Sequence, residues 1–209
     1  MRPHTRRLLH DSLLAAAADR PDHVALVTES ERVTYAELHE RANRIAHLFR
    51  SLGLEPGDHV AWCMENHPWY LSLAWGAHYA GLYYTAISSR LTGDEVAYIV
   101  DDCGAEVFVA SGATADVALG IVDATPGVDH RFVVDVSLDG HASFLDAVAS
   151  QSGEELEGAV EGMDMLYSSG TTGRPKGVKV PLRGVPLGTP GATNMLRIAF
   201  VRQDGAGSS

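Results

Sequence analysis

The stretch His59-Val60-Ala61-Trp62-Cys63-Met64 predicts a β-strand and opens a unit that recurs along the chain. Asn66 and Pro68 then open a helical stretch that ends at Gly81, and residues 83–87 return to a strand pattern. A strand, a helix and a second strand in this order are typical of a βαβ unit, in which the two strands run parallel.

The same alternation continues on both sides of this unit. Thr34 with Glu37, and Thr92 with Glu95, have the spacing of capping boxes, which satisfy unpaired backbone N–H groups where a helix begins. The expected strands cover residues 24–28, 59–64, 83–87, 106–110 and 131–134, and the expected helices cover 35–52, 68–80, 93–103, 116–124 and 144–149. The sequence therefore predicts an α/β fold of βαβ units with a largely parallel sheet.

Composition and charge exclude one broad class of function. The 209 residues are 45% hydrophobic and 21% charged, which is typical of a globular protein. The net charge of −11 is uneven: residues 1–163 hold 10 arginines, no lysine and 25 acidic residues, whereas residues 164–209 hold six basic and two acidic residues. An acidic body argues against a general nucleic-acid binder. We expect any bound anion at the basic segment, which contains both lysines, Lys176 and Lys179.

Neither the cysteines nor the histidines have a metal-like spacing, so the sequence predicts no metal site. Two cysteines in apolar surroundings indicate a reduced, cytoplasmic protein, with peripheral membrane association as the alternative. Residues 2–14 are similar to a targeting signal, but they fit better an amphipathic helix that ends at Pro21. The uncharged residues 70–89 include His78, glycines and hydroxyls, which favours a buried helix and strand over a membrane span.

The residues that suggest chemistry are concentrated in one loop. It reads Ser168-Ser169-Gly170-Thr171-Thr172-Gly173-Arg174-Pro175-Lys176-Gly177. Its glycines allow backbone N–H groups to converge on one anion, and its hydroxyls add further donors. Pro175 restricts the backbone beside the Lys176 ammonium. This pattern predicts a polyphosphate-binding site made of Ser168, Ser169, Gly170, Thr171, Thr172, Gly173 and Lys176.

Two other interpretations of the loop are weaker. A Walker A loop requires G-x-x-x-x-G-K-[ST], but Pro175 stands at its second glycine and Gly177 replaces the hydroxyl that would hold Mg²⁺. A plain surface hairpin also uses glycine, serine and threonine. However, it would not require both of the chain's lysines to lie in this segment.

The loop resembles the signature of the AMP-forming adenylating superfamily, which includes acyl-CoA synthetases, luciferases and peptide-synthetase adenylation domains. The resemblance covers most of residues 5–180, including Thr34-Tyr35-Ala36-Glu37-Leu38, residues 42–46 and residues 57–61. Residues 83–87 and 165–169 look most like the fatty-acid–CoA ligase branch. Ala86 and Ser88 depart from that pattern, since many members carry a proline and an asparagine there.

The resemblance implies a two-step, ATP-dependent acid–thiol ligase. A carboxylic acid, with a fatty acid favoured, would attack ATP to give an acyl-adenylate and pyrophosphate, and coenzyme A would then displace AMP. ATP, Mg²⁺ and coenzyme A are the implied cofactors and co-substrates. Lys176 and Thr172 are the implied catalytic residues, because they would meet the charge of the departing pyrophosphate.

The same resemblance divides the chain in two. Residues 1–180 correspond to a partial N-terminal AMP-binding domain, and residues 181–209 form an irregular tail rich in proline and glycine, as in a truncated, frameshifted or fragmentary chain. The family's Tyr-Gly-x-Thr-Glu segment, ribose-binding aspartate and late lysine have no match in this sequence. We therefore expect the chain alone to be inactive. The alternatives are a catalytically incomplete nucleotide-binding module and, third, a P-loop-like NTPase.

Overall fold

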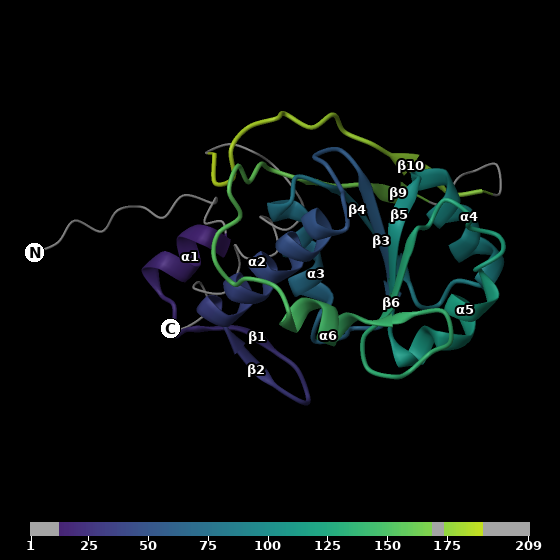
Figure 1. Cartoon of the computed structure of the whole chain (residues 1–209), viewed down its shortest axis with the longest axis horizontal. Helices are drawn as coiled ribbons and strands as arrows, with labels where there is room; N and C mark the ends of the chain where they lie inside the picture. Colours follow the sequence, from purple (N-terminus) through teal and green to yellow (C-terminus); the bar gives the residue numbers. More distant parts are fainter. Residues whose placement is uncertain (1–12, 169–173, 190–209) are drawn as a thin grey trace, which may run out of the picture.

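The computed structural model describes residues 13–168 and 174–189. A six-stranded sheet with the order β7-β6-β5-β3-β4-β8 forms the centre of the described part (Figure 1). Its strands are β3 (His59–Met64), β4 (Tyr83–Ser88), β5 (Ala105–Ala110), β6 (His130–Val133), β7 (Ala142–Ser143) and β8 (Met163–Asp164). Every neighbouring pair in this sheet is parallel, which confirms the predicted α/β fold class.

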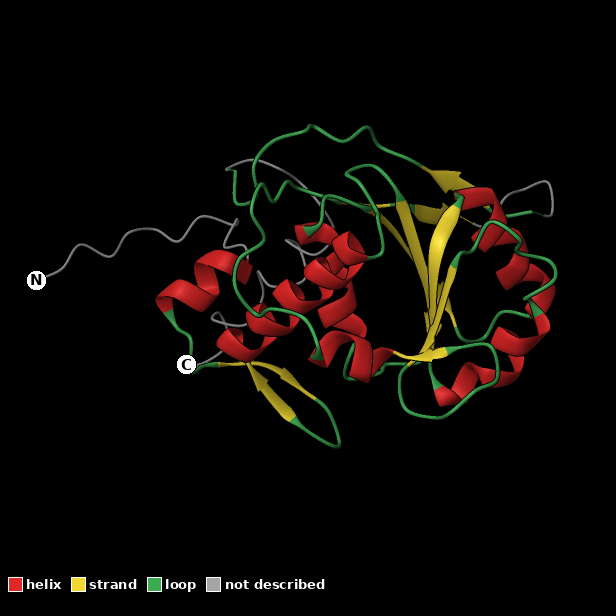
Figure 2. Cartoon of the chain, in the orientation of Figure 1, coloured by secondary structure: helices red, strands yellow, loops and turns green. Residues whose placement is uncertain are grey.

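Helices cover both faces of the sheet, as Figure 2 shows. They are α1 (Leu13–Asp19), α2 (Tyr35–Ser51), α3 (Tyr70–Tyr79), α4 (Gly93–Cys103), α5 (Ala115–Gly120) and α6 (Phe144–Ala149), with a 3₁₀ turn at Gly112–Thr114. The sheet has a hydrophobic core on each face, and alternate side chains of β3 pack into one core or the other, because successive side chains of a strand point to opposite faces. Trp62 packs with α2 and α3, and Cys63 packs with α4.

The helix starts follow the predicted capping chemistry. The Thr34 hydroxyl accepts the Glu37 N–H at 3.2 Å while the Glu37 carboxylate accepts the Thr34 N–H at 2.7 Å, and Thr92 with Glu95 forms the same box. The helix that opens at Thr92 ends at Gly104, which has a φ of 68°, a conformation that favours glycine. The helix expected over residues 116–124 is shorter than predicted, since α5 ends at Gly120.

Two antiparallel hairpins lie outside the central sheet. The strands β1 (Val24–Val27) and β2 (Arg32–Thr34) form the first, and β9 (Leu166–Ser168) and β10 (Lys176–Val178) form the second. The strand over residues 24–28 was predicted, but its pairing with β2 outside the parallel sheet was not. Strands of two or three residues are too short to show a periodic pattern in the sequence.

A glycine allows α2 and α3 to pack closely. A Cβ on Gly76 would overlap the Ile45 side chain and would lie 3.2 Å from the Ala42 carbonyl oxygen. We expect Gly76→Ala to lower the free energy of unfolding by about 1–3 kcal/mol through overpacking. Gly93→Ala is the matched control, because no atom lies within 4 Å of its added Cβ. Urea unfolding checks this prediction, and equal stability of the two variants would contradict it.

A lysine and a histidine fasten the segment after β10 to the amino ends of β3 and β4. The Lys179 ammonium donates to His59 Nε2 at 2.9 Å and lies 4.4 Å from the centre of the Tyr83 ring. The Tyr83 hydroxyl donates to the Val180 carbonyl oxygen at 2.8 Å and accepts the Leu182 N–H at 3.0 Å. Burial and the Lys179 charge lower the pKa of His59 to about 4, and Asp58 opposes this shift.

This geometry predicts a specific acid sensitivity. Since the folded-state pKa of His59 lies below its ordinary value, its contribution to stability is complete above about pH 6.5 and is lost as the pH falls towards 4. When the pH falls from 7 to 5, we expect the free energy of unfolding of the native chain to decrease by about 1–2 kcal/mol more than that of the His59→Gln variant. Urea unfolding at both pH values measures the difference. His23→Gln, at an exposed histidine, is the control and should behave as the native chain does.

Candidate functional site

The predicted anion-binding segment begins at β8, the strand at one edge of the central sheet. The strand β8 pairs with β4 through Tyr83 with Met163 and Tyr84 with Asp164. The next residue, Met165, donates its N–H to the Tyr84 carbonyl oxygen at 2.9 Å. The chain then leaves the sheet and forms the β9–β10 hairpin, so the position of this hairpin is set by the edge of the sheet.

The hairpin brings two of the predicted site residues together. Ser168 and Lys176 are direct partners across the antiparallel pair, as are Leu166 and Val178. Since side chains alternate along a strand, these four residues share one face of the hairpin. That face is open to solvent: Leu166 is 46% exposed and Val178 is 54% exposed. The other predicted residues, Ser169, Gly170, Thr171, Thr172 and Gly173, lie outside the described residues.

The two lysines of the segment have different surroundings. Lys176 is exposed and forms no ion pair with a described residue, so its ammonium can meet an anion from solvent. Lys179, three positions later, is held against His59 and Tyr83. A hydroxyl and a cation side by side on an open face, Ser168 and Lys176, suit an anion with several oxygens. The geometry favours Lys176 as the anion-binding lysine.

The opposite face of the hairpin holds a contact that sequence reasoning missed. Tyr167 donates its hydroxyl to the Asp102 carboxylate near the end of α4 at 2.6 Å. The sequence suggests only a solvated surface pair for Asp101 and Asp102, because adjacent helical carboxylates do not face each other. Burial, with Asp102 as the second cause, raises the pKa of Tyr167, which therefore stays a neutral donor. No local pattern signals this pair, since its partners are 65 positions apart.

A second unpredicted pair lies inside the protein. His78 and Glu161 are both buried, with His78 Nε2 2.6 Å from a Glu161 carboxylate oxygen. His78 Nδ1 lies 2.9 Å from the Gly162 carbonyl oxygen, and the other Glu161 oxygen accepts the Gly188 N–H at 2.8 Å. This pair joins α3 to two later segments of the chain, so its evident role is structural.

The remaining reactive side chains do not form a reaction centre within the described part of the chain. Cys63 and Cys103 are buried and unpaired, and burial raises the pKa of each thiol to about 11, which keeps it protonated. Residues 13–168 and 174–189 contain no group of three or more histidine, cysteine, aspartate or glutamate side chains arranged to hold a metal ion. We therefore assign no Mg²⁺ ligand to these residues.

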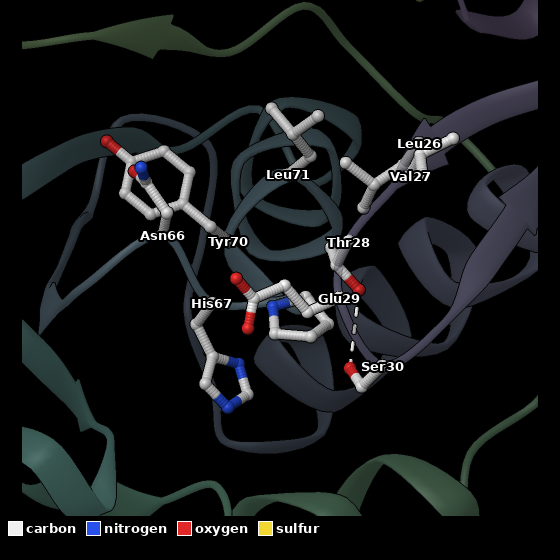
Figure 3. Close-up of a pocket in the computed structure, with 10 residues that line it drawn as sticks. Leu26, Val27, Thr28, Glu29, Ser30, Asn66, His67, Tyr70 and Leu71 are labelled. Carbon is white, nitrogen blue, oxygen red and sulfur yellow. Dashed lines mark hydrogen bonds between the residues drawn. The ribbon is translucent and has the colours of Figure 1, made fainter.

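Two of the cavities in the described part lie beside the residues that follow β3. The larger of these two, of about 870 Å³, is lined by residues 26–30, 66–68, 70 and 71. Figure 3 shows His67 and Tyr70 from one segment and Thr28, Glu29 and Ser30 from the other. The second, of about 430 Å³, is lined by Tyr70 and by residues 64–66 and 86–90. Neither is lined by the β9–β10 hairpin, which pairs Ser168 with Lys176.

No helix among the described residues has the length and apolar character needed to cross a bilayer.

Comparisons with known proteins agree with this architecture. One relative, from Mycobacterium tuberculosis, is named as a CoA ligase of a propanoate that carries a methyl-dioxo-octahydroindenyl group. It is 36% identical, and the match covers 78% of this chain and 35% of the relative. A long-chain-fatty-acid–CoA ligase of the same species is 34% identical over 70% of this chain and 29% of its own length. The chain thus spans about a third of the length of these relatives.

Solved structures show the same relationship. A fatty acyl-CoA synthetase of Mycobacterium tuberculosis superposes with a TM-score of 0.68 at 29% identity, covering 79% of this chain and 33% of that protein. The family model described as AMP-binding enzyme matches residues 13–204, which include both the central sheet and the β9–β10 hairpin. The chain therefore belongs to the AMP-binding enzyme family.

Proposed function

We propose that this chain provides the triphosphate-binding part of an AMP-forming acyl-CoA ligase. The observation that carries the proposal is the pairing of Ser168 with Lys176 on the open face of a hairpin, in a chain of the AMP-binding enzyme family. Lys176 supplies a cation without a competing ion pair among the described residues, and Ser168 supplies a hydroxyl beside it. Such a pair matches the β- and γ-phosphates of MgATP.

The proposed reaction has two steps. A carboxylate oxygen of the acid attacks the α-phosphorus of ATP, the bond from this phosphorus to the oxygen bridging to the β-phosphate breaks, and pyrophosphate leaves. The thiol sulfur of coenzyme A then attacks the acyl carbon, losing its proton, and AMP leaves with the electron pair of the acyl–oxygen bond. Mg²⁺ enters as part of MgATP and lowers the negative charge of the triphosphate.

The residues of the loop have distinct proposed roles. Lys176 meets the negative charge that grows on pyrophosphate as it departs, and Thr172 donates a hydroxyl to the same group. Ser168, Ser169, Gly170, Thr171 and Gly173 complete the binding of the phosphate oxygens through hydroxyl and backbone N–H groups. Catalysis of this kind depends on positioning and electrostatics, so no residue of the loop needs to form a covalent bond.

We propose a carboxylic acid with a large apolar body as the substrate, with a fatty acid favoured. Support comes from relatives that are named as a long-chain-fatty-acid–CoA ligase and as CoA ligases of a cholestenoate and of a bicyclic propanoate. These acids differ in shape but share a carboxylate on a hydrophobic skeleton.

The first test is the MgATP affinity of Lys176→Ala, measured by isothermal titration calorimetry. We expect the dissociation constant to rise at least about tenfold, because one charge-assisted contact to phosphate is lost. Lys179→Ala removes the same charge from a lysine held against His59, so it should change the affinity far less. Equal weakening by the two variants would indicate only a general charge effect. Unchanged affinity in Lys176→Ala would contradict the proposed function.

A further inference from the structure

The hairpin that carries Ser168 and Lys176 rests on the last turns of α4. Figure 1 shows β9 and β10 beside this helix, and β10 contacts it directly. The Asp102 carboxylate accepts the Tyr167 hydroxyl at 2.6 Å through one oxygen and the Tyr98 hydroxyl at 3.4 Å through the other. Both oxygens of the Asp102 carboxylate thus accept a hydrogen bond, and the shorter of the two comes from the hairpin residue Tyr167.

The opposite strand of the hairpin is shaped to allow this contact. Gly177 is the cross-strand partner of Tyr167, and a Cβ on it would overlap the Met165 side chain and lie 3.0 Å from Tyr167 Cζ. The absence of a side chain at Gly177 therefore leaves the space that the Tyr167 ring occupies.

A third contact lies just before β10. The Arg174 guanidinium carbon lies 5.2 Å from the centre of the Tyr98 ring, within the range of a cation–π interaction. Tyr167 precedes the loop residues 169–173 and Arg174 follows them, so α4 holds the chain on both sides of the loop.

The alternation of strand side chains connects this contact to the open face. With Tyr167 and Gly177 directed at α4, their neighbours Ser168 and Lys176 must point away from it. A shift of one residue in the pairing would exchange the two faces and turn Lys176 towards the helix. A hydrogen bond to an ionised carboxylate is stronger than one between neutral groups, so it is suited to holding this register.

We propose that Asp102 and Tyr167 are positioning residues for the triphosphate, acting through Ser168 and Lys176 rather than by touching the nucleotide. This inference rests on the proposed function. It predicts that loss of the Asp102–Tyr167 bond weakens MgATP binding because the face bearing Lys176 is no longer fixed, although Lys176 itself remains.

The test compares conservative variants of the full 209-residue chain by titration calorimetry with MgATP, with circular dichroism to verify folding. We expect Tyr167→Phe and Asp102→Asn each to raise the dissociation constant about fivefold. Asp101→Asn is the matched control, since it removes the same charge from the adjacent exposed residue and should leave the affinity unchanged. If one variant fails to fold, the other provides the test. Affinity changes no larger than that of Asp101→Asn would overturn the inference.

A second experiment distinguishes a positioning role of Tyr167 from a merely structural one. In the Lys176→Ala background, Tyr167→Phe should cause a much smaller loss of MgATP affinity than in the native chain, because only the contact made by Ser168 remains to be positioned. An equal loss in both backgrounds would overturn the inference, since a structural effect would be additive. The two proposals fail differently: if only Lys176→Ala weakens binding, the positioning role is wrong and the proposed function stands. If Lys176→Ala has no effect, the proposed function itself is wrong.

Discussion

The short parallel pairing of β8 with β4 determines where the candidate site lies. Two residue pairs, Tyr83 with Met163 and Tyr84 with Asp164, attach the chain to the edge of the central sheet. The Thr85 hydroxyl extends this attachment by donating to the Met165 carbonyl oxygen at 3.2 Å. The strand β4 is itself buried along most of its length, so the hairpin starts from a rigid part of the core. Precise placement of a binding site requires such support.

Residues that are held by side-chain contacts lie on both sides of the exposed Lys176. On one side, Tyr167 is bonded to Asp102 of α4, and on the other, Lys179 is held by His59 and Tyr83 at the amino ends of β3 and β4. Both lysines are exposed, but only the Lys179 ammonium is held by described side chains. This difference in surroundings, more than the basic charge of the segment, is the reason for proposing Lys176 as the residue that binds phosphate.

Much of the fold could be predicted because its signals are local. The strand over residues 59–64 has the predicted bounds, and both capping boxes form as their spacing indicates. The two-residue strands β7 and β8 and the pairs Tyr167–Asp102 and His78–Glu161 could not be predicted, because they depend on contacts between distant residues. Sequence reasoning placed Ser168 and Lys176 in one site, and the hairpin pairs them. The roles of residues 169–173 stay predictions, since these residues lie outside the described ones.

The most direct measurement exploits the fact that the chain contains only two lysines. Limited acetylation followed by mass spectrometry reports the reactivity of Lys176 and Lys179 separately. If Lys176 contacts the β- and γ-phosphates, saturating MgATP should lower its acetylation severalfold, while AMP at equal occupancy should leave it unchanged and Lys179 should respond to neither. Equal acetylation of Lys176 with and without MgATP would contradict the assignment of this hairpin as the triphosphate-binding site.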